Sequence, residues 1–280
     1  MVFVLTLNQL LRSGDLDPKT VRLVRHRDST PKIHRQLYDA GVTLDPRFEQ
    51  YQERQGTLQV IEQFRAAKFL AGFVAEPVTG STVFAGVWER LEDRTQHRGN
   101  PFIPDPPTTK AIEFVTRRVN KFDPYVGRLV IDWGDGTRAW VQRADNQDKP
   151  IVEVRKTRRD PDFPGFLAFQ LPLDQVEGLY ASWVQVLRNA RGVYLLVRRK
   201  TGEQYVGSAY GDDGFFGRWL CYQDGHGGNV GMRELAAVAS EYDVNILEVA
   251  ASDATVDEIC QRESLWKTKL GTRVVGLNRN

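Results

Sequence analysis

One stretch of sequence decides the fold of the C-terminal part of the chain: residues 192–207, which read GVYLLVRRKTGEQYVG. Both ends of the stretch are rich in β-branched and aromatic residues, which favour strands. Residues 198–203 between them are mostly charged and are typical of a hairpin loop. The stretch therefore predicts a β-hairpin that brings Tyr194 and Tyr205 close together.

A short helix is predicted after this hairpin, over residues 215–222. Arg218 and Tyr222 are spaced by one helical turn, so they project from the same face. One guanidinium and one phenol would then lie side by side.

A longer helix is predicted between Thr255 and Gly271. Thr255 and Glu258 have the spacing of a capping box, and Gly271 is a typical left-handed terminator. Glu263 falls within the apolar stripe of this helix. Because an unpaired buried charge is costly, this carboxylate needs a partner, and a divalent cation would supply one.

In their order along the chain, these features resemble the GIY-YIG nuclease family, with Val in the middle of both signature segments. The likeness covers residues 192–280, and residues 224–229 and 270–278 are similar to the restriction-enzyme branch. Either tyrosine segment alone would be weak evidence, because unrelated strands contain Gly-Val-Tyr. Five elements follow the family order: the segments of Tyr194 and Tyr205, then Arg218, Glu263 and Asn278.

The resemblance implies an α+β domain, with a small mixed or antiparallel three-stranded sheet flanked by helices, that cuts phosphodiesters with a single metal ion. Glu263 would hold Mg²⁺ or Mn²⁺, Arg218 would bind a non-bridging phosphate oxygen, and Asn278 would orient the site. Tyr194 or Tyr205 would take the proton from the attacking water. A phenol with a pKa near ~10 is a poor base at neutral pH, so a neighbouring positive charge would have to lower it.

The chain departs from several restriction-enzyme relatives one turn after the helical Arg, where Tyr222 stands in place of His. Three tyrosines are therefore candidate proton carriers, and the assignment of the base stays open. His226 either contacts phosphate from the glycine-rich loop or is a turn histidine without chemistry. On the hairpin loop, three basic residues are placed to touch DNA: Arg198, Arg199 and Lys200.

Each candidate also has a purely structural interpretation. Tyr194 and Tyr205 could be ordinary strand residues with buried rings. Arg218 could pair with a nearby surface aspartate, Asp212 or Asp213, which contributes little. Glu263 could be an exposed helical residue that pairs with Lys267 one turn later. The ordered set, and not any single residue, favours the catalytic interpretation.

The remainder of the chain predicts two further regions, a helical segment over residues 1–71 and a β-rich domain over 72–187, before the nuclease domain at 188–280. Helices are expected from Asp17 and over 59–70 and 173–187. Strands are expected at 83–89, 128–133, 139–142 and 151–155. A hairpin turn at 134–137 and the short connections predict a compact, partly closed barrel.

The β-rich region is expected to target the nuclease to its DNA. Its aromatic residues, among them Trp88, Trp133, Trp140 and Trp183, either form the core or line a pocket that stacks a flipped or modified base. A basic segment, residues 19–35, either follows phosphates or is a solvated helix face.

Composition narrows the class of protein. The net charge is only +2, so any basic surface for nucleic acid must be local. No apolar run has the length of a membrane span and no signal peptide is evident, so a cytoplasmic protein without membrane contact is expected. Cys221 and Cys260 are expected to be reduced core residues.

These observations predict a divalent-metal-dependent endonuclease that acts on double-stranded DNA, in defence against foreign DNA. Its target is either an unmodified sequence or DNA with an altered base or backbone. A non-catalytic nucleic-acid-binding module and a repair or homing nuclease are the alternatives. One metal site cuts one strand, so a double-strand break requires a homodimer on DNA or two successive cuts.

Overall fold

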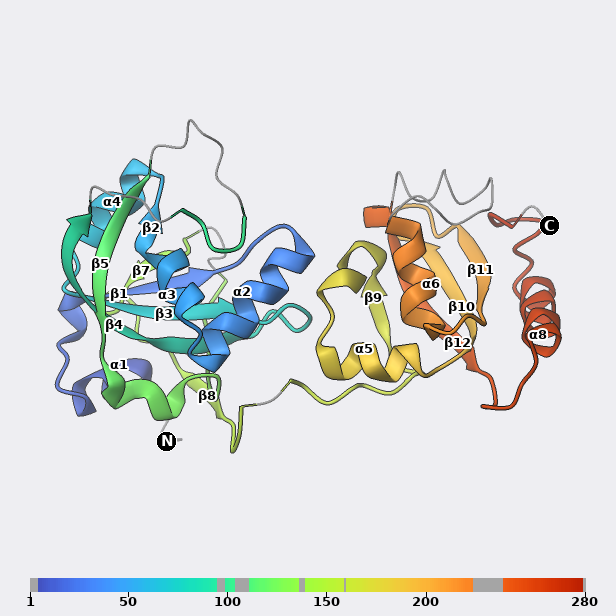
Figure 1. Ribbon diagram of the computed structural model, residues 1–280, viewed down its shortest axis with the longest axis horizontal. Helices are drawn as coiled ribbons and strands as arrows, with labels where there is room; N and C mark the ends of the chain where they lie inside the picture. The colour runs from blue at the N-terminus through green and yellow to red at the C-terminus, as the bar shows by residue number, and fades with distance from the viewer. Residues whose placement is uncertain are drawn as a thin grey trace. The chain divides into compact units, whose positions relative to one another are not determined.

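The chain folds into two compact units, Met1–Arg159 and Asp160–Asn280. The computed structural model describes residues 5–94, 99–103, 111–135, 139–158, 160–223 and 239–278. Both units combine helices with a sheet, so the fold is of the mixed α and β type that the sequence predicts (Figure 1).

The division differs from the predicted boundaries at 71 and 187. Strands β1 (Val21–His26) and β3 (Phe69–Ala75) pair in parallel, so residues before and after position 71 belong to one sheet. Helix α5 (Ala181–Arg188) belongs to the C-terminal unit. The boundary therefore falls near residue 160.

The N-terminal unit is built on a sheet in which β3 is central. Its sequence, FLAGFVA, is apolar throughout and almost entirely buried, as expected for a strand covered on both faces. The strand order is β2-β5-β4-β3-β1-β7, and β6 pairs with both β4 and β8. The other strands are β2 Arg54–Gln55, β4 Thr82–Arg94, β5 Ile112–Arg118, β6 Leu129–Ile131, β7 Val141–Arg143 and β8 Ile151–Val154.

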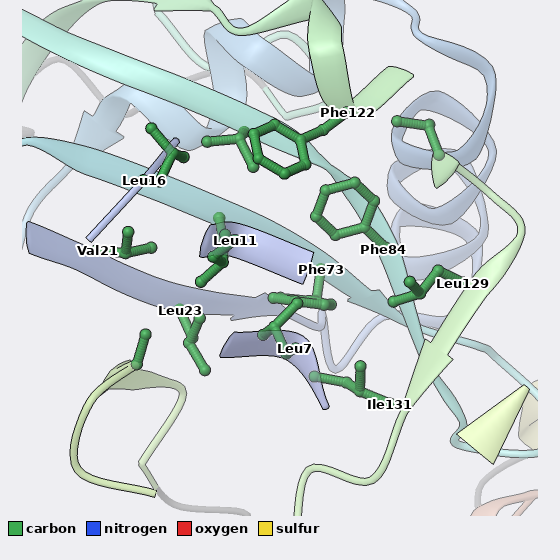
Figure 2. Close-up of a cluster of buried hydrophobic side chains, with 14 of the residues drawn as sticks. Leu7, Leu11, Leu16, Val21, Leu23, Phe73, Phe84, Phe122, Leu129 and Ile131 are labelled. Atoms are coloured by element: carbon green, nitrogen blue, oxygen red, sulfur yellow. The ribbon is translucent and has the colours of Figure 1, made fainter. Parts of the chain in front are cut away.

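The helices of this unit are short, and α2 packs on β3 and β4. They are α1 Leu7–Ser13, α2 Pro31–Thr43, α3 Pro46–Glu53 and α4 Leu58–Arg65, with 3-10 turns η1 Pro18–Thr20 and η2 Asn120–Tyr125. The main core gathers side chains from α1, β1, β3, β4 and η2, with Phe73, Phe84 and Phe122 at its centre (Figure 2).

Several expectations for this unit are wrong. The turn near 134 does not join paired strands, because β6 pairs with β4 and β8 while β7 pairs with β1. Asp17 begins only η1, and the basic segment continues as β1 before α2. In the described part of the chain the strand pairings follow an open path, which does not confirm the predicted partly closed barrel.

Most of the tryptophans singled out above are core residues. The exposed fraction is 1% for Trp88 and 5% for both Trp133 and Trp183, whereas Trp140 is partly exposed. Cys221 and Cys260 are free thiols, but both are exposed instead of buried.

The C-terminal unit has an antiparallel sheet with strand order β11-β10-β12-β9. The resemblance implied three strands, and β9 is the addition, because Leu171 and its neighbours pair with β12. The strands are β9 Gln170–Pro172, β10 Gly192–Arg198, β11 Gln204–Ala209 and β12 Tyr242–Val249.

Helices pack around this sheet. Helix α6 contacts β11 and α5, while α8 contacts β10 and β11. The predicted capping box of α8 is confirmed: Thr255 accepts from the Glu258 amide, and Glu258 accepts from Thr255. Gly271 is left-handed, with φ of 63°. The elements are α5, α6 Gly214–Gln223, α8 Val256–Lys269, and the 3-10 turns η3 Leu173–Gly178 and η4 Ala239–Glu241.

Among the described residues, no helix combines the length and apolar character that a membrane span requires.

Candidate active site in the C-terminal unit

The β10–β11 hairpin forms as predicted and places two tyrosines on one face. Tyr194 lies opposite Gly207, and Tyr205 lies opposite Leu196. Residues directly opposite each other on paired strands share a face of the sheet, and so do residues two positions apart on one strand. Tyr194 and Tyr205 are therefore diagonal neighbours on one face. The hairpin therefore brings the two phenols together.

Both glycines of the hairpin segments are required by close approaches. A Cβ at Gly207 would collide with the hydroxyl end of the Tyr194 side chain, so this ring lies across the bare backbone of β11. A Cβ at Gly192 would collide with the carbonyl oxygen of Glu248 on β12. Glycine is the residue that allows such contacts.

Helix α6 adds a third tyrosine and a guanidinium to the same face. The hydroxyl groups of Tyr194 and Tyr222 are joined by a short hydrogen bond, and their rings meet edge to face with centroids 6.2 Å apart. Arg218 donates a hydrogen bond to Tyr194 and lies 5.7 Å from the centre of the Tyr222 ring. Trp219 packs against Tyr194 from the side, with centroids 6.1 Å apart.

Burial controls the ionisation of this cluster. Tyr194 and Tyr222 have exposed fractions of 0% and 1%, and burial raises the pKa of both phenols above the usual value. Burial also raises the pKa of Tyr205, and the negative charge of Glu263 raises it further. Arg218 opposes these shifts without reversing them, so none of the three phenols has the lowered pKa that a base at neutral pH would need.

Arg218 itself stays charged. Burial alone would lower its pKa, but the phenol oxygens of Tyr194, Tyr222 and Tyr205 raise it above the usual value. Arg218 is partly buried, and it interacts with the three tyrosines. The ion pair that the structure shows for Asp213 is with Arg188, at 3.6 Å.

Glu263 reaches the cluster from α8 and has partners at both oxygens. Its Oε1 lies 2.9 Å from Lys267 Nζ, and its Oε2 accepts a short hydrogen bond from Ser208. The Lys267 pairing considered from the sequence is present, but Glu263 is not an exposed surface residue. Its side chain is 16% exposed, and Lys267 is buried. The buried ammonium needs this carboxylate as its counter-ion.

Asn278 holds the backbone of β11. Its Oδ1 accepts from the Val206 amide at 3.0 Å, and its Nδ2 donates to the Val206 carbonyl at 2.9 Å. The amide of Leu277 also donates to the Gln204 carbonyl at 2.8 Å. Because Val206 follows Tyr205 directly, Asn278 fixes the strand position of that tyrosine.

The basic residues of the hairpin loop are all paired with carboxylates. Arg198 lies 2.6 Å from Glu241 and 3.1 Å from Glu203, and Arg199 lies 3.5 Å from Asp243. Lys200 is 3.7 Å from Glu241 and its side chain remains 79% exposed. Of the three, Lys200 is the most available for a phosphate. His226 lies outside the described residues.

The structure thus gathers Tyr194, Tyr205, Tyr222, Arg218 and Glu263 from β10, β11, α6 and α8. Sequence reasoning did not identify Ser208 as a partner of Glu263. Its only signal is its place in β11, three residues after Tyr205. A pocket of about 620 Å³ in this unit lies elsewhere, beside Arg188, Arg191 and Ala250, and none of the five residues lines it.

Comparison with known proteins gives partial likenesses. Two solved structures are similar to part of the chain, both of the catalytic domain of the intron-encoded homing endonuclease I-TevI. A variant of that domain is 23% identical over 32% of this chain and 94% of that chain, with a TM-score of 0.27. The second is 22% identical over 32% of this chain and 98% of that chain, with the same TM-score. No family model and no curated protein matches the chain.

Proposed function

We propose that the C-terminal unit is a divalent-metal-dependent endonuclease of the GIY-YIG type, which hydrolyses phosphodiester bonds in DNA. The observation that carries the proposal is the meeting of three phenols and a guanidinium on one face of the β10–β11 hairpin, with the Glu263 charge acting on Tyr205. Separate elements supply these groups, and no single packing interaction requires all of them.

Arg218 would bind the scissile phosphate. A guanidinium presents a fork of N–H donors and stays ionised at every working pH, so it can stabilise the negative charge that develops in the transition state. Its contacts with Tyr194 and Tyr222 hold the fork in one orientation before the substrate arrives. Such preorganisation avoids rearrangement at the moment of reaction.

The donor set around Glu263 fits a magnesium ion that keeps most of its water. Each carboxylate oxygen has one partner, Ser208 or Lys267, which leaves acceptor positions on both. No cluster of three or more His, Cys, Asp or Glu side chains that could hold a metal is found in the described residues. Glu263 would be the protein ligand, and the cation would stabilise the leaving oxygen when bound.

We assign the attacking water to Tyr205. Tyr194 and Tyr222 are fully buried and share a hydrogen bond. Tyr205 also bonds to Tyr222, but it is partly exposed and the charge of Glu263 acts on it. All three phenols are protonated at neutral pH because their pKa values are raised. Tyr205 would therefore orient the water by a hydrogen bond in this state, and the Tyr222–Tyr194 pair would hold Arg218.

The test is nicking of supercoiled plasmid by the full chain with Mg²⁺ and after chelation. We expect the parent to nick only with the metal, Glu263→Gln to lose activity, and Tyr205→Phe to lose most of it. Tyr210→Phe is the matched control, because Tyr210 is 46% exposed and lies just beyond β11. Nicking by Glu263→Gln at the parental rate would remove the metal-ligand assignment.

In this proposal the N-terminal unit directs the nuclease to its target, and the role is defence against foreign DNA. Modification-dependent cleavage is separated from cleavage of an unmodified sequence by digesting modified and unmodified copies of one plasmid. Equal digestion of both copies would exclude dependence on the modification. Linear product that depends quadratically on enzyme concentration would indicate a homodimer on DNA, and stepwise nicking would indicate two successive cuts.

A further inference from the structure

The N-terminal unit contains a pocket of about 510 Å³, and Trp140 is among its lining residues. It lies at the carboxyl end of β1, beside the end of α3, β2 and Trp140. Small-molecule pockets in proteins span roughly 300–1,000 Å³, so this one has the size for a single nucleotide rather than for a protein segment.

One side of the pocket is aromatic. The His26 ring lies 5.5 Å from Tyr51 and 6.1 Å from Trp140, measured between ring centroids. Tyr51 and Trp140 are partly exposed where they line the pocket, whereas His26 is buried. Phe48 packs against the far side of His26, edge to face at 5.2 Å. Planar ligands bind such walls by stacking or by edge contacts.

His26 contributes hydrogen-bonding capacity instead of charge. Burial lowers its pKa to about 4, although the hydrogen bond with Gln52 opposes that shift. The bond joins His26 Nε2 and Gln52 Oε1 at 3.2 Å and fixes the ring. At neutral pH the aromatic side of the pocket is therefore uncharged.

The other side of the pocket is cationic. Arg25, Arg27 and Arg54 line it with a single carboxylate, Asp28. Burial lowers the pKa of Arg25, and the charge of Arg27 lowers it further, so the two guanidinium groups repel each other. Within the described part of the chain neither Arg25 nor Arg27 forms an ion pair, and the Nε of Arg25 is buried without a hydrogen-bond partner.

A half-buried guanidinium with an unused donor is costly unless an anion is supplied. Arg25 is held in this position by its Nη2, which donates to the Gly80 carbonyl at 3.0 Å. An aromatic wall beside a preset cationic rim matches a planar heterocycle that carries a phosphate. A nucleotide has both of these parts.

We propose that this pocket receives one nucleotide extruded from the DNA substrate, with its base against Tyr51, Trp140 and His26 and its phosphates against Arg25 and Arg27. The proposal rests on the proposed nuclease function, since it makes the N-terminal unit the part that selects where the C-terminal unit cuts. The proposal also changes which aromatic residues would read the base. Of the four tryptophans named from the sequence, Trp140 is the one that lines this pocket.

The experiment uses the full chain carrying Glu263→Gln, so that DNA is bound and not cut. Two duplexes of equal length are compared by fluorescence anisotropy, one fully paired and one with a single mismatched base. A mismatched base is extruded at lower cost, so we expect tighter binding of the mismatched duplex. Trp140→Ala and Tyr51→Ala should abolish this preference and weaken binding roughly five- to a hundredfold.

Matched variants separate the contributions. Trp140→Phe keeps a ring and should retain part of the preference. Arg27→Ala should weaken binding of both duplexes and reduce the salt dependence by about one phosphate contact. Arg12→Ala is the charge control, because Arg12 is exposed on α1 and does not line the pocket. Thermal melting of each variant verifies that it is folded.

The proposal is overturned if the parent shows no preference for the mismatched duplex, or if folded Trp140→Ala and Tyr51→Ala bind it as the parent does. Deoxynucleoside 5′-monophosphates provide a second arm. If they bind tightly in a Trp140-dependent manner while both duplexes bind equally, the pocket takes a free nucleotide and the DNA proposal fails.

Failure of the nuclease proposal gives a different result. Plasmid nicking by the unmodified chain is measured separately with Mg²⁺. Pocket-dependent DNA binding without any nicking would support the pocket and refute the nuclease. Nicking with no effect of the pocket variants on binding would support the nuclease and refute the pocket.

Discussion

The two units both bury ionisable side chains, but the C-terminal cluster is closed on itself whereas the N-terminal one borders an open pocket. Tyr194 and Tyr222 bond to each other, and Glu263 is held by Ser208 and Lys267. In the N-terminal unit, Arg25 and Arg27 line an open pocket. The closed cluster suits the proposed cleavage, which needs fixed groups, and the open charged pocket suits the proposed binding of a nucleotide.

The largest effect that we expect is on the rate of DNA nicking, and it is expected for variants of the C-terminal cluster. Arg218→Lys keeps the charge beside the tyrosines but loses the fork, so the single-turnover nicking rate should fall by about 10²–10³-fold. Arg188→Lys is the control, because Arg188 is 46% exposed and pairs with Asp213. A rate within a factor of about three of the parent would contradict the role of Arg218 in binding the scissile phosphate.

A smaller effect is expected where packing maintains the closed cluster. Gly207→Ala would push a methyl group into the Tyr194 side chain, so we expect a loss of about 1–3 kcal/mol in unfolding free energy, together with lower activity. Gly211→Ala is the matched control, since a Cβ there meets nothing within 4 Å. Urea unfolding of both variants measures the difference. Equal stability would show that β10 and β11 can separate at this point.

The N-terminal unit should respond to acid through its buried imidazoles. The pKa of His26 is lowered to about 4 by burial, and burial also lowers that of His34. The unfolded chain then binds more protons than the folded one, so stability is present above pH 6.5 and is lost as pH falls toward 4. Between pH 7 and pH 5 we expect His26 to contribute a loss of about 2 kcal/mol.

This pH dependence is measured by urea unfolding of the full chain at both pH values, with His26→Gln as the comparison. The variant should lose less stability between pH 7 and pH 5 than the parent. An identical loss in both proteins would place the acid-sensitive group elsewhere.

The smallest effect is expected at the edge of the C-terminal sheet. Asn278→Ala removes two hydrogen bonds to Val206, which should cost about 1–2 kcal/mol and loosen the strand that carries Tyr205. Nicking should slow without a change in magnesium dependence, because Asn278 positions the strand and holds no metal. Asn146→Ala, at an exposed position, should leave both quantities unchanged. A shifted magnesium requirement would contradict the positioning role.

The sequence predicted those parts of the fold that local patterns determine. The hairpin, the capping box at Thr255 and the left-handed Gly271 follow from residues close together in the chain. The parallel pairing of β1 with β3 and the addition of β9 were not predicted, because strand partners distant in sequence leave no periodic signal.

The candidate site was predicted in the same uneven way. The motif residues were identified because their order resembles a family, whereas the contact of Ser208 with Glu263 joins positions 55 residues apart. The raised pKa values of the tyrosines follow from burial, which spacing alone does not give. For the N-terminal pocket, the sequence suggested Trp140 and the basic segment as separate features but not their meeting, because the lining residues come from separate segments, with Asn100 and Trp140 far from His26 in the chain.

The contact between Asn278 and Val206 also sets an order of events during protein synthesis. The two residues are 72 positions apart, so the tyrosine hairpin leaves the ribosome well before the residue that fixes it. At roughly 5–20 residues per second this interval lasts several seconds. Glu263 also arrives during that interval, so the N-terminal unit can fold while the proposed cutting site is still incomplete.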